Sequence, residues 1–258
     1  MALAGGMAGF SFRNALAALL LLVPLAATAQ VGPGDREEIV RLAQSRRIPE
    51  ADVAPLVDEV SRASERGLPQ ATLLNKVKEG LSKGYPAARV HEVLKDLIGQ
   101  LDAARDMLGT TGDEAMRTRA IVMLAEALGR GVTRDEFEEL RKLAADGGTP
   151  RQSESLAIGA RFWALLKEAG FTTAALPLVA ETVRQDYRAA DIVSLARDMA
   201  ARREELTAGT RLDALRQAVR RGERPERLLP PRDAGTIERP RAERPQPPDR
   251  TERQRPAR

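Results

Sequence analysis

Few side chains in this chain are of a type and spacing that could carry out chemistry. The sequence has no cysteine and a single histidine, His91, which excludes a thiol nucleophile, a thiolate metal site and a zinc site built from paired histidines. An imidazole can act as a general base, but no serine or acidic residue at a suitable spacing singles out His91 for that role. We expect neither a metal site nor a cofactor.

The pair Glu154-Ser155, followed by Gly159-Ala160, resembles a fragment of the lytic transglycosylases, exported helical enzymes that cleave peptidoglycan with a single glutamate. The resemblance implies that Glu154 is the acid and base and that Ser155 supplies a supporting hydroxyl. The Gly-Leu-Met-Gln run of that family is replaced here by the Arg-Phe-Trp-Ala of residues 161–164. This enzyme is therefore the alternative hypothesis, and the main hypothesis assigns no catalytic residue.

Four aromatic residues are candidate binding anchors, since aromatic side chains often dominate the energetics of interfaces. The same large side chains also fill cores, and for each of the four we favour the core. These residues are Tyr85, Phe162, Trp163 and Phe171.

A recurring turn must position these side chains. In four copies a Gly is followed by an apolar residue, by Pro or Thr, and then, five positions after the first apolar residue, by a second one. Two looser copies, at Ile48 and Tyr187, keep the apolar pair but lack the Gly, and the second also lacks the Pro. A glycine that follows a helix can adopt the left-handed conformation that closes it. The next apolar residue then packs on the second apolar residue as a hydrophobic staple, with the helix cap between them. The apolar pairs are Ile48 and Val53, Leu68 and Leu73, Tyr85 and Val90, Val132 and Phe137, Phe171 and Leu176, and Tyr187 and Ile192.

Such tight turns predict antiparallel helical hairpins. At one of the caps, Thr133 followed by Glu136 also predicts a capping box. Helix pairs recur about every 37 to 39 residues, a period that two-helix solenoids use, although a closed bundle remains open. The predicted cap residues are Pro49, Pro69, Pro86, Asp113, Thr133, Pro150, Thr172 and Arg188.

Composition supports an all-α fold of stacked antiparallel helical hairpins over residues 30–206. The chain is 43% hydrophobic but only 3% aromatic, and it lacks the alternating pattern of strands. We expect two sub-bundles to meet near residues 99–112. Gly80 and Gly129 lie inside helical patterns, where each marks either a close helix contact or an early helix end.

The first 29 residues have the pattern of a secretory signal peptide. Arg13 supplies the positive charge, an apolar run covers Ala15–Ala27, and Ala27-Thr28-Ala29 fits the rule for cleavage sites. An uncleaved membrane anchor is the alternative, but the run contains Pro24 and is shorter than the roughly 20 residues of a span. We therefore expect cleavage after Ala29 and a periplasmic or secreted protein with no transmembrane span.

The C-terminal part changes in composition. Residues 207–224 are expected to form a terminal helix or a linker, and residues 225–258 hold eight of the sixteen prolines and many arginines. The latter segment is predicted to be a disordered tail, because it has too little apolar surface to offset the entropy of ordering. Its alternating Arg and Glu favour a solvated linker, with adhesion to an anionic surface as the alternative.

Together these patterns favour an exported protein of the bacterial cell envelope that acts as a non-catalytic helical-repeat binding or scaffold module. Its partner would be a protein or a cell-envelope polymer. Nucleic acid is not expected, because the protein is exported and the tail lacks aromatic stacking residues. The sequence does not specify the oligomeric state.

Overall fold

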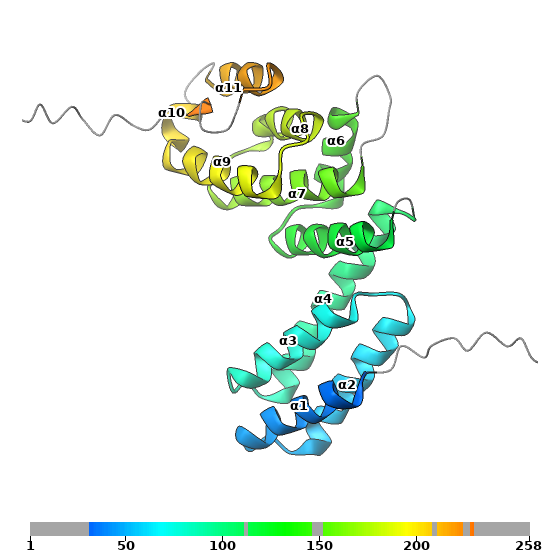
Figure 1. Cartoon of the computed structure of the whole chain (residues 1–258). Coiled ribbons are helices and arrows are strands. Elements are labelled where there is room, and N and C mark those ends of the chain that lie inside the picture. Colours follow the sequence, from blue (N-terminus) through cyan, green and yellow to red (C-terminus); the bar gives the residue numbers. More distant parts are fainter. Residues whose placement is uncertain (1–30, 111–112, 146–151, 208–210, 224–227, 230–258) are drawn as a thin grey trace, which may run out of the picture. The chain divides into compact units, whose positions relative to one another are not determined.

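The computed structural model of the 258-residue chain describes residues 31–110, 113–145, 152–207, 211–223 and 228–229. Within these ranges the chain forms eleven α-helices, one short 3-10 helix and no strand (Figure 1). The predicted all-α fold class is therefore confirmed. The predicted signal peptide, residues 1–29, and all but two residues of the predicted tail, residues 225–258, lie outside the described residues.

The chain divides into two compact units. Among the described residues, unit 1 comprises residues up to Phe137 together with Gln152–Arg161, and unit 2 comprises residues 138–145 and those from Phe162 onward. The boundaries fall inside two helices, so the expectation that sub-bundles meet near residues 99–112 is wrong. Two helices pack closely against each other across that region, and both belong to unit 1.

Unit 1 is built from stacked antiparallel helical hairpins (Figure 1). Helices that are neighbours in the chain pack together, and alternate helices also pack, α1 on α3 and α2 on α4. This second set of contacts is the arrangement by which hairpin repeats bury their apolar faces. Its helices are α1 (Pro33–Ser45), α2 (Glu50–Glu65), α3 (Gln70–Ser82), α4 (Ala87–Leu108) and α5 (Glu114–Gly129).

Unit 2 is helical as well. In it α8 packs against α11, and the short α10 packs against both α9 and α11. The segment 207–224 contains α11, which therefore belongs to the folded part of the chain. The helices α6 and α7 run from unit 1 into unit 2. The elements are α6 (Arg134–Ala144), α7 (Ser153–Glu168), the 3-10 helix η1 (Thr173–Ala175), α8 (Leu176–Arg184), α9 (Ala189–Ala201), α10 (Arg203–Thr207) and α11 (Arg211–Arg220).

The hairpin turns are closed as the sequence predicts. After α2, the Gly67 N–H donates to the Ser64 carbonyl at 2.8 Å and the Leu68 N–H to the Ala63 carbonyl at 3.1 Å. Gly67 has a φ of 82°, which is the left-handed residue of a Schellman motif. The same pair of hydrogen bonds closes the helices before Ile48, Tyr85, Val132, Phe171, Tyr187 and Glu223.

The two copies without glycine keep this geometry at an energetic cost. Arg47 has a φ of 58° and Asp186 a φ of 49°, in a region where a side chain costs roughly 1–2 kcal/mol. Both still close the helix with the paired backbone hydrogen bonds. The spacing of the apolar pair, rather than the glycine alone, therefore identifies this turn.

The helix starts agree with most of the predicted caps. The Thr133–Glu136 capping box is present, with hydrogen bonds of 2.8 and 3.2 Å in the two directions, and the Asp113 carboxylate accepts hydrogen bonds from two backbone N–H groups. Two starts differ from the prediction. The helix expected after Pro150 begins at Ser153, and Thr172 opens η1 before α8 begins at Leu176. Pro177 suits the first turn of α8 because it has no N–H to donate.

Gly80 and Gly129 both mark close approaches between helices, and Gly129 is at the same time the last residue of α5. A Cβ on Gly80 of α3 would lie 2.7 Å from a methyl group of Val90 on α4. A Cβ on Gly129 of α5 would lie 2.9 Å from the side-chain oxygen of Gln100 on α4. Val90 is buried and branched, whereas the end of Gln100 can rotate away. Only the first contact is therefore rigid.

We expect Gly80→Ala to lower the free energy of unfolding by up to about 2 kcal/mol, because an overpacking cost of about 1–3 kcal/mol is offset by a gain of about 1 kcal/mol in helix propensity. Gly129→Ala is the matched control, since Gln100 can move aside, and its stability should stay equal or rise. Chemical denaturation followed by far-UV circular dichroism measures both variants. Equal losses in the two variants would contradict the rigid contact at Val90.

Long-range polar contacts join residues about one repeat apart. Arg46 at the end of α1 donates to the carbonyl of Ser82, 36 residues on, at the end of α3. Arg105 of α4 donates to the carbonyl of Arg66, 39 residues back, after α2. These arginines satisfy carbonyls that a helix end leaves unpaired. In unit 2, Arg184 of α8 donates to the Leu143 carbonyl of α6, 41 residues back.

Arg184 also pairs with a buried carboxylate. Its guanidinium contacts Glu181 at 2.7 Å, and Glu181 is only 2% exposed. We expect Arg184→Met to lower the stability of unit 2 by about 3 kcal/mol, because removing one partner strands a buried charge and a carbonyl. Arg188→Met is the matched control at an exposed pair with Asp191, and should cost less than about 1 kcal/mol.

The chain offers a direct measurement, because its only tryptophan, Trp163, is buried in unit 2. Urea unfolding followed by tryptophan fluorescence then reports the stability of that unit in each variant. Replacing Glu181 by Met in the Arg184→Met background should recover most of the loss. A loss of similar size in the Arg188→Met control would contradict the assignment.

Candidate functional site

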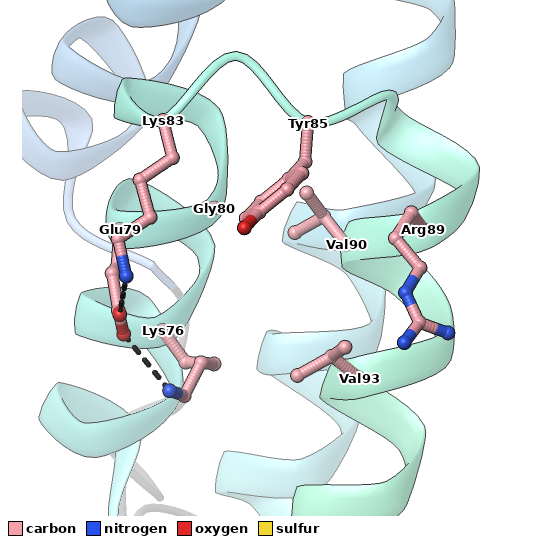
Figure 2. A pocket seen from close by; sticks show the side chains of 8 residues that line it. All are labelled: Lys76, Glu79, Gly80, Lys83, Tyr85, Arg89, Val90 and Val93. Atoms are coloured by element: carbon pink, nitrogen blue, oxygen red, sulfur yellow. Dashed lines mark hydrogen bonds and ion pairs between the residues drawn. The ribbon is translucent and has the colours of Figure 1, made fainter.

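Unit 1 carries a cavity between α3 and α4, beneath the turn that joins them (Figure 2). Its volume is about 290 Å³. Cationic side chains surround an apolar floor, and all of the lining residues come from one hairpin. They are Lys76, Glu79, Gly80, Lys83, Tyr85, Arg89, Val90 and Val93.

A second cavity of about 500 Å³ adjoins the first. The two share Lys76, Glu79 and Val93, so together they form one continuous depression across α3, α4 and α5. We call it the unit 1 groove. The additional lining residues are Thr72, Asn75, Asp96, Leu97, Gln100, Leu101, Val122, Glu126 and Gly129.

Tyr85 is unusual among the apolar residues of the hairpin turns. The corresponding Leu68, Val132 and Phe171 are 3%, 4% and 5% exposed, whereas Tyr85 is 51% exposed. Figure 2 shows its side chain extending from the turn into the space between α3 and α4, near Gly80 and Val90. The turn therefore leaves an aromatic ring at the mouth of the first cavity, where a ligand can reach it.

Glu79 holds two lysines at the same end of the groove (Figure 2). Its carboxylate lies 2.8 Å from the Lys76 ammonium and 2.5 Å from the Lys83 ammonium. The hydrogen bond from Lys76, which has the larger effect, and the one from Lys83 lower the pKa of Glu79 to about 2. The hydrogen bond to Glu79 in turn raises the pKa of Lys83. Two cations thus share one anion, which leaves one positive charge uncompensated.

The other end of the groove has a different chemical character. Asn75 and Gln100 bring amide groups that can donate and accept hydrogen bonds. Asp96 and Glu126 bring carboxylates, and Glu126 is paired with Arg130 at 2.9 Å. The groove is therefore cationic at the Tyr85 end and carries carboxylates at the α5 end.

The residues of the alternative enzyme hypothesis lie elsewhere. Glu154 and Ser155 occupy the first turn of α7, are both half-buried, and line neither cavity of the groove. A carboxylate at this position complements the dipole of the helix. The lone His91 is half-buried on α4 and is likewise not part of the groove lining.

Of the four aromatic candidates, three are core residues and one is exposed. Phe162, Trp163 and Phe171 are buried, whereas Tyr85 lines the groove. The lysines beside Tyr85 were missed by sequence reasoning, because lysines on a helix are usually solvated. A signal did exist in Gly80, whose missing side chain lets α3 and α4 approach at this point.

Within the described ranges, no helix is both long and apolar enough to cross a membrane. The described side chains also contain no cluster of three or more acidic or histidine residues arranged to hold a metal ion. Comparison with protein-family models, with curated proteins and with solved structures gives no match for this chain. Function is therefore argued from the groove itself.

We expect the Glu79 carboxyl to titrate near pH 2, because two ammonium groups stabilise its charged form. Since the folded pKa is depressed, its contribution to stability is present above the ordinary pKa of 4.5 and is lost as the pH falls toward 2. NMR titration of the carboxyl carbon measures this pKa. Replacing both Lys76 and Lys83 by Gln should return the pKa toward 4.5. A wild-type Glu79 carboxyl that already titrates at 4.5 would contradict its pairing with Lys76 and Lys83.

Proposed function

We propose that this protein is a non-catalytic binding module of the bacterial cell envelope, and that the unit 1 groove is its binding surface. The observation that carries the proposal is the half-exposed Tyr85 at the mouth of a groove with an apolar floor. The corresponding Leu68, Val132 and Phe171 are buried and Ile48 and Tyr187 are half-buried, so Tyr85 is the most exposed of the apolar turn residues and is available to a partner.

The size and lining of the groove support this role. Cavities of about 290 and 500 Å³ accept several side chains of a partner. Val93 and Leu97 are half-buried on the floor, and polar groups stand along the edges. An apolar floor with few polar groups at its edges is typical of ligand-binding grooves.

A protein segment fits this groove better than a cell-envelope polymer does. The floor is aliphatic and aromatic, whereas a glycan presents mainly hydroxyl groups. Asn75 and Gln100 can satisfy the backbone amides of a peptide. The exposed carboxylate of Asp96 disfavours a nucleic acid, whose phosphates it would repel.

The location in the envelope is part of the proposal and rests on the sequence. The signal-peptide pattern of residues 1–29 supports export, with cleavage after Ala29. Residues 225–258 are proposed to act as a solvated linker. Since α11 packs against α8, a variant that tests the tail must end after Leu229 and not before α11.

A capture experiment from envelope extract tests the groove. The immobilised mature protein, residues 30–258, should retain a partner that the double variant Asn75→Arg with Tyr85→Ala loses, because bulk fills the groove and the aromatic anchor is gone. Both positions are exposed, so folding should be unaffected. Quantitative mass spectrometry at low and high salt identifies the partner.

The matched control is Met116→Ala with Gly99→Arg. Met116 is the second exposed large apolar residue, and an added side chain at Gly99 meets open space. Neither residue lines the groove. A partner retained equally by the groove variant and the control would contradict the proposal. A partner lost on removal of residues 230–258 alone would place binding in the tail.

A further inference from the structure

At the cationic end of the unit 1 groove, the two lysines have more N–H donors than they direct at Glu79. Each lysine ammonium carries three N–H groups, and Lys76 and Lys83 each direct one of them to Glu79. Glu79 offers one negative charge to the two lysines, so the cluster keeps a net positive charge. A second carboxylate can therefore approach both ammonium groups without displacing Glu79.

Arg89 adds little to this charge. Its guanidinium pairs with Glu92 at 2.9 Å, and both side chains are about two-thirds exposed. Exposed pairs of this kind are worth little and are well solvated. The specific positive feature of the cavity is thus the lysine pair.

An apolar surface lies directly beside the lysines. Tyr85 and Val93 line the cavity together with the buried Val90 (Figure 2). A ligand that carried only a negative charge would leave this surface in contact with water. The chemistry of the cavity therefore matches a carboxylate attached next to an aromatic or large aliphatic group.

We infer that the Tyr85 end of the groove receives an acidic residue of a partner protein segment, together with an adjacent aromatic or large aliphatic residue. The carboxylate accepts hydrogen bonds from N–H groups of Lys76 and Lys83 that are not directed at Glu79, and the apolar side chain packs on Tyr85 and Val93. This inference rests on the proposed function and specifies its ligand.

The far end of the groove sets the direction of the segment. Asp96 would repel a second acidic residue there, whereas the charge of Glu126 is compensated by Arg130 and Arg161. Asn75 and Gln100 can pair with the peptide backbone. The acidic residue is thus placed at the Tyr85 end, and neutral or basic residues continue toward α5. A surface of anionic lipid would need a positive face along its whole length, which the groove does not provide.

The chain offers a specific probe of this site. It contains two tyrosines, Tyr85 at the groove and Tyr187 in unit 2. Incorporation of 3-fluorotyrosine into the mature full-length protein gives two fluorine NMR signals, and Tyr85→Phe assigns them. Tyr187, half-buried and hydrogen-bonded to the Glu223 carbonyl, is the internal reference.

The ligands are pools of capped octapeptides with a central Glu-Phe or Phe-Glu pair and Ala, Ser, Asn or Gln elsewhere. Comparison pools carry Gln-Phe, Lys-Phe or Glu-Ala at the centre. The acidic aromatic pools should shift the Tyr85 signal and leave that of Tyr187 in place. Replacing Glu by Gln in the peptide should weaken binding about tenfold or more, since a charge-assisted hydrogen bond is lost.

Two protein variants distinguish a specific role of Lys76 and Lys83 in binding from a general effect of positive charge. Replacing Lys76 and Lys83 by Gln should weaken binding of the acidic pools about tenfold. Replacing the exposed Lys95 and Lys142 by Gln removes the same two charges elsewhere and should leave binding unchanged. Circular dichroism of both variants checks that the helices are intact.

The inference is overturned if no pool moves the Tyr85 signal, if the Gln-Phe or Lys-Phe pools bind as well as Glu-Phe, or if the control variant loses as much affinity. It is also overturned if phosphatidylglycerol vesicles shift the Tyr85 signal and the acidic pools do not. The proposed function itself is tested separately by the capture experiment, and it falls if the groove variant retains the partner as well as the control does or if binding depends on residues 230–258 alone. The two failures are therefore distinguishable.

Discussion

The structure depends on a single backbone device, a left-handed residue that closes a helix and turns the chain directly into the next one. It occurs at Gly67, Gly84, Gly131 and Gly170, and the strained Arg47 and Asp186 adopt it too. The short connection leaves two helices no alternative to lying side by side. An apolar face on each helix then has to be covered by the following hairpin, which is how α1 comes to pack on α3 and α2 on α4.

The groove is a local variation on this device. At Gly84 the closing residue is followed by Tyr85, whose ring remains half exposed instead of filling the core. On the same hairpin, Gly80 brings α3 and α4 close together, and the lysines of α3 stand beside the cavity so formed. The same turn thus connects α3 to α4 and places an aromatic ring at the surface.

Much of the fold could be predicted from the sequence, because turns and caps are local. The offset of five between apolar residues marked the helix ends at Leu68 and Phe171, and Thr133 marked a capping box. The groove could not be predicted, since a pattern along one helix does not say which face its neighbour leaves open. Tyr85 fits the staple pattern as well as Phe171 does, yet only Phe171 is buried. The division into two units inside α6 and α7 was missed for the same reason.

The arginine contacts between helix ends have a kinetic consequence. Arg46, Arg105 and Arg184 each reach a carbonyl 36 to 41 residues away, close to one repeat. The chain loops that must close are therefore short, and the entropy lost in closing a loop grows with its length. Folds in which contacting residues are close in sequence form rapidly, because no contact requires a distant segment to be ordered first. Each hairpin can dock as soon as the next one exists, so the chain can assemble progressively from either end.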